Sequence, residues 1–395
     1  MTGGWDVVVI GGGAAGIAAA EAAKAENNDA SVLIIHEEKE LPYVRTKLSK
    51  LLASGFNVEE FLIRPQSWYD EQGIELRRGV AAQAVNPDEK TVATSDGESI
   101  AYGSLILATG GVPAFPKNIR EHEAESFYTL KTVADAARIK RDARRAKNAL
   151  VVGMGVLSVE IAQQLSDMKT NVTLVGATGQ FMPRQLSPRA GEIMEDLMSK
   201  NNIRLYFQEE VLSFEKNNKR GMDVMMIRNS GRFDMVIFCI GFSPDTALAR
   251  SAGLEVNRGV KVDDHLRTSN PDIYAAGDLA EHADGSISYV WNAAEHQGAF
   301  AGRNAAGADA VFEAKPFRLR ADVFGTHFLS INKPRNPLEH EIEEAENGDA
   351  YYGFYFDDDR LIGAVVVGDK ERADEYERAV QEGWSRDQVN QAFFS

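Results

Sequence analysis

The feature that most constrains how this chain can fold is a unit that recurs: a buried strand, a glycine-rich turn, a helix and a second strand. The first copy occupies residues 6–36 and the second occupies residues 149–175 of the 395-residue chain. In such a unit the two strands lie parallel in one sheet and the helix packs across its face. Two copies therefore predict an α/β protein with two Rossmann-like dinucleotide-binding domains.

In the first copy the strand DVVVI (6–10) leads into the turn GGGAAG (11–16). Its glycine spacing allows a tight turn, a close approach of backbone N–H groups to a pyrophosphate, and close packing of helix on strand. After the second strand, SVLIIH (31–36), an acid is expected to hold the adenosine ribose, and Glu37 stands there. A glycine-rich turn that binds nothing is the alternative. The residues assigned to this site are Gly11, Gly13, Ala14, Ala15, Gly16, His36 and Glu37.

The second copy, ALVV (149–152) followed by GMGVLS (153–158), departs from this pattern in two places. Ser158 stands where the third glycine belongs, and the small size of serine is compatible with the fold. The strand that should end in the ribose-binding acid runs into Gly176, and the following ATGQ holds no arginine for a 2′-phosphate. The fold is therefore predicted, whereas binding of NADH, of NADPH or of neither is left open.

Composition narrows the classes of function. The chain carries 43 lysines and arginines against 59 acids, a formal net charge of −16, which argues against nucleic-acid and membrane-surface partners. Its single cysteine, Cys239, rules out an internal disulfide, a CxxC redox pair and a thiolate zinc site. The histidines never fall at metal-ligand spacing, so we expect no metal centre. The N-terminal apolar run is interrupted by glycines and no Lys or Arg precedes it, so we expect a cytoplasmic protein without a signal peptide.

Further motifs follow in order along the chain. They are LPYVRTKLSK (41–50), LILATGGVP (105–113), VIFCIGFSPD (236–245), IYAAGDLAE (273–281) and WNAAEHQGAFAGRN (291–304). Together with the two units, they resemble the flavoprotein reductases that have two dinucleotide-binding domains. The resemblance is closest to rubredoxin reductases, the ferredoxin reductases of oxygenase systems and the flavoprotein segment of assimilatory nitrite reductases. It implies bound FAD, with NADH or NADPH as the electron donor.

The resemblance also assigns residues. It implies that Asp278 accepts hydrogen bonds from the ribityl chain of FAD, that Arg45 lies near the phosphates, and that the helix beginning at Trp291 points at the flavin O2 edge. The alternatives are a turn cap for Asp278, a solvated charge for Arg45 and core packing for Trp291. The residues implied at FAD beyond the first turn are Arg45, Lys50, Ala108, Thr109, Gly110, Gly277, Asp278, Trp291 and Gln297. Those implied at the nicotinamide nucleotide are Gly153, Gly155, Val156, Leu157 and Gly241.

Lys50 and Glu160 are the pair to which the resemblance gives a catalytic role. In the family these two positions meet beside flavin N5, the atom that receives the hydride. A cation there stabilises the charge of the reduced ring, and the carboxylate orients the cation. The alternative for either residue alone is a solvated charge on a helix.

The cysteine count bears on where the electrons go. Relatives of the glutathione-reductase type use a CxxxxC disulfide, and others use one cysteine in the segment occupied here by LPYVRT. Cys239 lies instead in the apolar run MVIFCI, where we expect a buried, inert thiol. Electrons are therefore expected to pass directly from the flavin to a small redox protein of rubredoxin or ferredoxin type. The alternatives are an NAD(P)H oxidase that reduces oxygen or small acceptors, and a flavin-binding regulatory or assembly protein whose nucleotide site has decayed.

The motifs also place the domain boundaries. We predict an FAD-binding domain from residues 1–115 and 240–312, an NAD(P)-binding-like domain at 116–239, and a small α+β domain at 313–395. The last domain is expected to hold a strand or two, a hairpin around the run DDDR and an amphipathic helix. The family places this module where it shapes acceptor access or forms a dimer contact, so a homodimer stays open.

Two runs of charge remain. RIKRDARRAK (138–147) is predicted to be helical and is either a docking patch for an acidic acceptor or a solvated helix face. Such a patch would offset the long-range repulsion between an acidic acceptor and a chain of charge −16. The acidic run EHEIEEAENGD (339–349) is expected to be an exposed loop.

Overall fold

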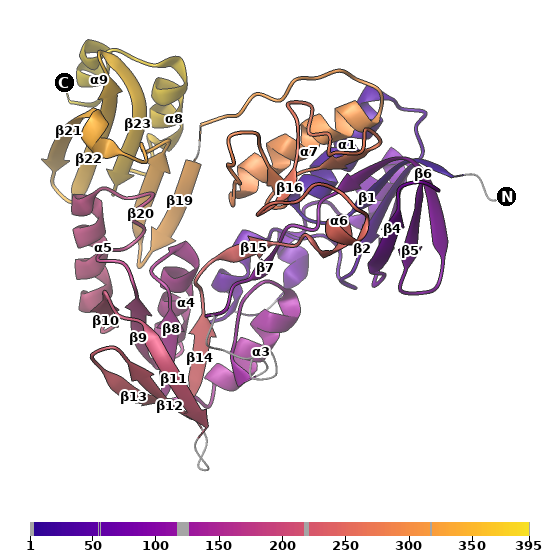
Figure 1. Ribbon diagram of the computed structural model, residues 1–395. Coiled ribbons are helices and arrows are strands. Elements are labelled where there is room, and N and C mark those ends of the chain that lie inside the picture. The colour runs from indigo at the N-terminus through magenta and orange to yellow at the C-terminus, as the bar shows by residue number, and fades with distance from the viewer. Residues whose placement is uncertain are drawn as a thin grey trace. The chain divides into compact units, whose positions relative to one another are not determined.

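The structure of the chain is a computed structural model that divides into two compact units, each described by itself (Figure 1). The residues that it describes are 4–53, 55, 57–116, 126–216, 221–316 and 318–394. The first unit consists of residues 1–47, 57–112 and 242–315, and the second of residues 48–56, 113–241 and 316–395.

The first unit is built on a seven-stranded sheet in which the recurring unit lies at the centre. The strands β3, β2, β1, β6 and β17 are parallel neighbours, and β5 and β4 continue from β6 as an antiparallel extension. These strands are β1 (Trp5–Ile10), β2 (Val32–His36), β3 (Ile74–Arg78), β4 (Ala82–Asn86), β5 (Thr91–Thr94), β6 (Ser99–Leu107) and β17 (Ile273–Ala275). The inner strands β1 and β2 are buried on both faces, as expected of unbroken apolar runs in a parallel sheet.

Smaller elements complete the first unit. The short pairs are β7 (Gly111–Pro113) with β15 (Phe242–Pro244), and β16 (Val260–Lys261) with β18 (Ala280–Glu281). The helices are α1 (Ala14–Glu26), α2 (Gln66–Gln72), α6 (Ala247–Ser251), α7 (Trp291–Ala305) and the 3₁₀ turns η1 (Arg45–Lys47) and η3 (Val58–Phe61).

The alanine-rich sequence of α1 has a packing reason. A Cβ atom on Gly298 of α7 would lie 2.1 Å from the carbonyl oxygen of Ala15, and one on Gly302 would lie 2.0 Å from that of Ala19. The two helices therefore touch backbone to backbone, which only residues without bulky side chains permit. This contact fixes α1, and with it the glycine-rich turn that precedes it.

The second unit contains the second copy of the recurring unit. A parallel sheet in the order β10-β9-β8-β14 lies beside an antiparallel meander β11-β12-β13. These strands are β8 (Asn148–Val152), β9 (Asn171–Gly176), β10 (Arg204–Phe207), β11 (Val211–Lys216), β12 (Met222–Met226), β13 (Ser230–Phe233) and β14 (Met235–Phe238). The helices are η2 (Ser49–Leu51), α3 (Val133–Ala143), α4 (Val156–Asp167) and α5 (Pro188–Lys200). Both Rossmann-like folds predicted from the sequence are confirmed.

The C-terminal part of the second unit is an antiparallel sheet in the order β19-β20-β23-β22-β21. Its elements are β19 (Arg318–Val323), β20 (Thr326–Ile331), η5 (Pro337–Glu339), β21 (Glu341–Asn347), β22 (Ala350–Asp357), β23 (Arg360–Val367), α8 (Ala373–Glu382) and α9 (Arg386–Phe393). The helices α8 and α9 cover one face. On the other face the hydroxyl of Tyr351 bonds Ser187 at 2.6 Å and Ser330 donates to the Gln185 carbonyl at 2.6 Å. The predicted hairpin is confirmed, since β22 and β23 pair across the run DDDR. The predicted amphipathic helix is confirmed as α8.

One expectation was wrong: the acidic run 339–349 is not a loop. Its central part is β21, the edge strand that pairs with β22. The cations that neutralise it come from elsewhere in the unit. Arg386 pairs with Glu341 and Glu343, and Arg189 bonds Glu346 at 2.6 Å. An edge strand rich in charge is protected from pairing with other chains, which is a common use of acidic residues in sheets.

Within the described residues, none of the helices has the length and apolar character that crossing a membrane requires.

Candidate functional site

Three segments that the sequence analysis assigned to FAD follow three neighbouring parallel strands of the first unit. The turn at Gly11 follows β1, Ala108–Gly110 follows β6, and Gly277–Asp278 follows β17. The Ala108 amide donates to the Ile10 carbonyl at 2.8 Å, and the Ala276 amide donates to the Leu107 carbonyl at 3.0 Å. The segments therefore meet at the carboxyl edge of one sheet, where open α/β sheets bind their ligands.

The first glycine-rich turn is shaped to leave room at its tip. Gly11 has a φ of 116°, and a Cβ atom there would lie 2.2 Å from the Ala108 carbonyl oxygen, so a side chain is excluded. Gly13 faces open space instead. It precedes α1 without a capping side chain, so the first N–H groups of the helix, beginning at Ala14 and Ala15, have no side-chain partner there. Space together with free donors at a helix N-terminus fits the pyrophosphate of FAD.

The third glycine of this turn has a packing role. A Cβ atom on Gly16 would lie 1.8 Å from the Gly11 carbonyl oxygen, so the helix can approach the strand only with glycine in this place. This agrees with the role that the glycine spacing predicts.

The acids after β2 differ in their surroundings. Glu37 is exposed, whereas Glu38 is half-buried and accepts a bond of 2.6 Å from the Arg45 guanidinium and one of 2.6 Å from the Tyr43 hydroxyl. Glu37 thus remains the acid available to a ribose, and the charge of Arg45 is compensated by Glu38. The predicted contact of Arg45 with phosphates stays a prediction.

His36 is buried under the glycine-rich turn. A Cβ atom on Gly12 would lie 2.7 Å from His36 Nδ1, so the imidazole supports the turn from below. Burial lowers the pKa of His36 to about 4, so the ring is neutral at ordinary pH.

Gln297 is placed to hold the turn that carries Asp278. Its side chain is only 2% exposed, its Oε1 accepts a 2.7 Å bond from the Gly277 amide, and its Nε2 lies 3.2 Å from His282 Nε2. We therefore assign Gln297 to positioning the turn, a role that its place in a helical motif did not reveal. Trp291 is half-buried against the core of this unit, and its Nε1 donates to Glu295 at 2.8 Å.

Thr109 and Gly110 are hydrogen-bonded to Asp245, the last residue of the motif VIFCIGFSPD (236–245). The Thr109 hydroxyl donates to the Asp245 carbonyl at 3.1 Å, and the Asp245 amide donates to the Gly110 carbonyl at 2.9 Å. These contacts fix the end of β6 next to the predicted FAD segments.

The second glycine-rich turn repeats the shape of the first. Gly153 has a φ of 136°, with a Cβ position 2.3 Å from the Cys239 carbonyl oxygen, and Gly155 faces open space before Val156 and Leu157 begin α4. Ser158 is fully buried and donates its hydroxyl to the Gly155 carbonyl at 2.6 Å. Serine is therefore accommodated in the place of the third glycine. Gly241, the other residue predicted here, has a φ of 105° and accepts from the Ala114 amide at 2.9 Å.

The missing ribose acid also has a structural reason. A Cβ atom on Gly176 would lie 2.6 Å from Cγ of Met154, so the methionine occupies the space of a side chain at the end of β9. The end of β9 thus offers neither an acid for a ribose nor an arginine for a 2′-phosphate.

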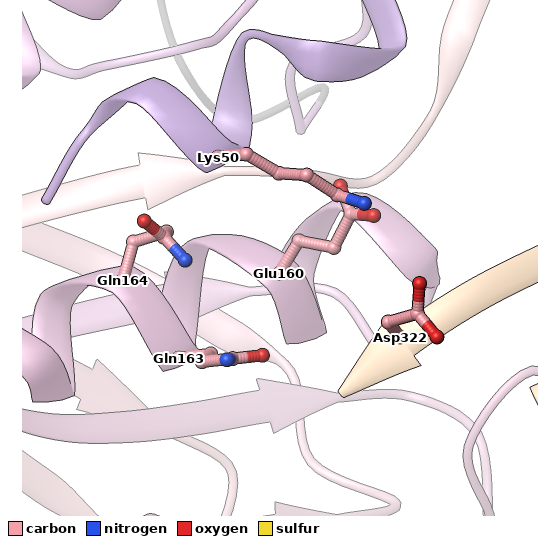
Figure 2. A pocket seen from close by; sticks show the side chains of 5 residues that line it. All are labelled: Lys50, Glu160, Gln163, Gln164 and Asp322. Atoms are coloured by element: carbon pink, nitrogen blue, oxygen red, sulfur yellow. The ribbon is translucent and has the colours of Figure 1, made fainter. Parts of the chain in front are cut away.

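Lys50 and Glu160 lie together in a pocket of about 230 Å³ within the second unit (Figure 2). Lys50 comes from η2, Glu160 from α4 and Asp322 from β19. The hydroxyl of Ser49 donates to Glu160 at 2.5 Å. Burial raises the pKa of Glu160, while the Ser49 hydrogen bond and the Lys50 charge oppose the rise. The family resemblance implied that Lys50 and Glu160 share one site. It did not single out Ser49, although Ser49 lies in the same motif as Lys50, and no motif links Gln163, Gln164 and Asp322 to the pair.

Cys239 follows β14 directly, at the base of the second turn. The residue is half-buried, and burial raises the pKa of its thiol, which favours the protonated form. Among the described residues, no group of three or more His, Cys, Asp or Glu side chains forms a metal site.

Comparisons with known proteins agree with this geometry. The family model of pyridine nucleotide-disulphide oxidoreductases matches residues 5–298, and that of the rubredoxin NAD⁺ reductase C-terminal domain matches residues 322–384. The NADH-rubredoxin oxidoreductase of Clostridium acetobutylicum is 28% identical over 91% of this chain and 90% of its own. Its solved structure gives a TM-score of 0.76 at 27% identity, covering 96% of each chain. The ferredoxin–NAD(+) reductase component of the anthranilate 1,2-dioxygenase system of Burkholderia cepacia is 30% identical over 73% of this chain and 72% of its own.

Proposed function

The chain belongs to the pyridine nucleotide-disulphide oxidoreductase family, and from that premise we propose that it is an FAD-dependent NAD(P)H:acceptor oxidoreductase whose acceptor is a small redox protein of rubredoxin or ferredoxin type. The relative from C. acetobutylicum carries this activity in its name, with NADH as the donor. The C-terminal match, at residues 322–384, is to a domain of rubredoxin reductases.

One observation carries the proposal: the three FAD segments meet at the carboxyl edge of one sheet, while the only cysteine of the chain has a buried thiol of raised pKa. Bound FAD supplies the conversion between a hydride taken up as two electrons and electrons released one at a time. Without a second cysteine the protein has no dithiol to relay them. The acceptor must therefore take electrons from the flavin itself.

The chain's own residues have separable tasks in this proposal. The N-terminal N–H groups of α1, open at Gly13, hold the pyrophosphate, and Glu37 holds the adenosine ribose. Gln297 fixes the turn from which Asp278 is proposed to reach the ribityl chain. Lys50 is proposed to stabilise negative charge on the flavin, with Glu160 orienting the ammonium.

An anaerobic titration of the purified protein with NADH and with NADPH tests the function. We expect the flavin absorbance to bleach within seconds with one nucleotide or both, and a rubredoxin added afterwards to restore it. No bleaching with either nucleotide would contradict the proposal and favour a flavin-binding protein whose nucleotide site has decayed. Bleaching that only oxygen reverses would favour an oxidase.

The finer predictions from the sequence remain proposals. These are the domain boundaries after residues 115, 239 and 312, the cytoplasmic location and the homodimer. The compact units place residues 48–56 with the second unit, so the segment that carries Lys50 is proposed to serve the nucleotide-binding half.

A further inference from the structure

The Lys50–Glu160 pocket has a second carboxylate, which comes from the C-terminal sheet. Asp322 of β19 lines the same pocket of about 230 Å³ as Glu160 of α4 (Figure 2). The two elements are joined by a hydrogen bond nearby. Gln163, three residues after Glu160 on α4, accepts a 3.1 Å bond from the backbone amide of Phe324. This bond fixes the β19–β20 turn on the helix that carries Glu160. The place of Asp322 in the pocket is therefore set by the fold.

Asp322 is held from its far side by two groups of the same sheet region. His327 lies opposite it in the β19–β20 pairing, and its Nδ1 is 2.8 Å from one carboxylate oxygen of Asp322. The Lys370 ammonium donates to the other oxygen at 3.2 Å. Burial alone would raise the pKa of Asp322, but these hydrogen bonds and charges hold it below its usual value. Asp322 is thus a fixed negative charge.

The charged groups that face Glu160 are few. In the described part of the unit, η2 contributes Lys50 and the hydroxyl of Ser49, and β19 contributes Asp322. The strands β8 and β9, which also pack against α4, hold no ionisable side chain. Burial raises the pKa of Glu160 most, and the negative charge of Asp322 adds to that rise. A like charge nearby disfavours the ionised form of a carboxyl group.

We propose that Asp322 is a positioning residue of the reaction: its negative charge disfavours the ionised form of Glu160, and His327 and Lys370 moderate that effect. An ionised Glu160 contributes a negative charge beside the Lys50 ammonium, whereas a protonated Glu160 does not. The C-terminal sheet thereby controls the net charge of the pair. The link to flavin reduction rests on the proposed function, but the link between Asp322 and Glu160 does not.

Two substitutions should move the titration of Glu160 in opposite directions. Asp322→Asn removes the negative charge at nearly constant shape, so the midpoint should fall. Lys370→Met leaves Asp322 charged and less compensated, so the midpoint should rise. The rise should be smaller, because the Lys370 side chain is 66% exposed and its charge is screened by solvent.

The direct measurement is an infrared pH titration of the oxidised holoenzyme. The protonated carboxyl band of Glu160 is identified by its loss in Glu160→Gln, and its midpoint is followed in the wild type and both variants. The pH profile of flavin reduction by NADH is recorded on the same samples. We expect the kinetic midpoint to move with the infrared midpoint in each variant.

Unchanged infrared midpoints, or midpoints that move in the same direction in both variants, would overturn the inference, since a general loosening of the pocket has no reason to give opposite signs. If Asp322→Asn fails to fold, Lys370→Met still decides, because an absent rise contradicts the proposal. If NADH cannot reduce the flavin of the wild type, the proposed function is contradicted instead. The infrared titration then still tests whether the Asp322 charge affects Glu160.

Discussion

Glu37 and Glu38 are neighbours after β2, but their surroundings give them different roles. One carboxylate is accessible to a ligand, and the other is used in contacts within the protein. Glu38 is bound by Arg45 and Tyr43, whereas Glu37 is exposed. The sequence placed an acid at the right distance from the glycine-rich turn, which is why Glu37 could be predicted. It could not show that Arg45 has a carboxylate partner seven residues before it, because that contact depends on the path of the chain after the strand.

Lys50 can be tested by removing its charge. Lys50→Met should slow flavin reduction by NADH on the order of 10²-fold, because a preorganised positive charge is lost where negative charge develops. FAD should stay bound, since Lys50 does not belong to the first unit, which holds the three FAD segments. Anaerobic stopped-flow absorbance measures the rate, and the flavin-to-protein ratio measures occupancy. The exposed Lys39→Met is the matched control. Equal rates for both variants and the wild type would remove Lys50 from the reaction.

The buried histidine gives the stability of the protein a defined pH dependence. His36 has a pKa of about 4 in the folded chain and an ordinary value of 6.5, so in that window the unfolded chain binds the proton and the folded chain does not. The free energy of unfolding should therefore fall as the pH drops from about 6.5 to about 4, by about 3 kcal/mol. Urea unfolding at several pH values with excess FAD measures it.

A neutral side chain in the same place should remove this dependence. His36→Gln should show a smaller loss of stability across that pH range than the wild type. The control is His265→Gln in the same unit, where the side chain is 24% exposed. An identical pH dependence in His36→Gln and the wild type would show that other groups cause it.

At the scale of elements, close packing between α1 and α7 is the contact that holds the first glycine-rich turn. Gly298→Ala should lower the melting temperature of the holoenzyme, because its Cβ would lie 2.1 Å from the Ala15 carbonyl oxygen and force the helices apart. Overpacking of this kind costs about 1–3 kcal/mol. It should also weaken FAD retention, which gel filtration under dilution can follow.

The control for this prediction is Ala299→Val on the same helix, at a half-buried position. Melting temperatures that fall equally in Gly298→Ala and Ala299→Val would contradict a special role for the glycine.

Most elements could be predicted because their signals are local. The two βαβ units, the β22–β23 hairpin and α8 follow from apolar runs, glycine-rich turns and helical spacing. The strand β21 was missed because a run of acidic residues is typical of a solvated loop, and the arginines that neutralise them lie 43 or more residues away in sequence. Likewise, Asp322 enters the Lys50–Glu160 pocket through the packing of β19 on α4, which no sequence pattern records.

At the scale of the whole molecule, charge opposes the proposed partner. The net charge of −16 should repel an acidic acceptor at low salt, so electron transfer to such a rubredoxin should speed up as salt rises from about 10 mM to about 150 mM. Stopped-flow oxidation of the reduced flavin measures the rate. A rate that instead falls with salt would show that a local positive surface controls docking.

The exposed cations after α3 are the candidate for that surface. If they control docking, a double variant with Arg144→Glu and Arg145→Glu should lose the fall in rate, and the exposed Arg335→Glu should not. The predicted helix is shorter than this run, since α3 ends at Ala143 and Arg144 and Arg145 follow it. If the run is only a solvated surface, the double variant should behave as the wild type.

The membership of residues 48–56 in the second unit has a consequence for recombining this protein with its relatives. A chimera cut only at positions 115 and 240 would inherit Lys50 from one parent and Glu160 from the other. Yet residues 48–56 contact the rest of the second unit, since the Lys140 ammonium donates to the Leu51 carbonyl at 3.1 Å. Junctions chosen only from the order of the domains along the sequence would thus combine Lys50 of one parent with Glu160 of the other. A functional hybrid needs a second pair of junctions, on either side of residues 48–56, so that Lys50 and Glu160 are exchanged together.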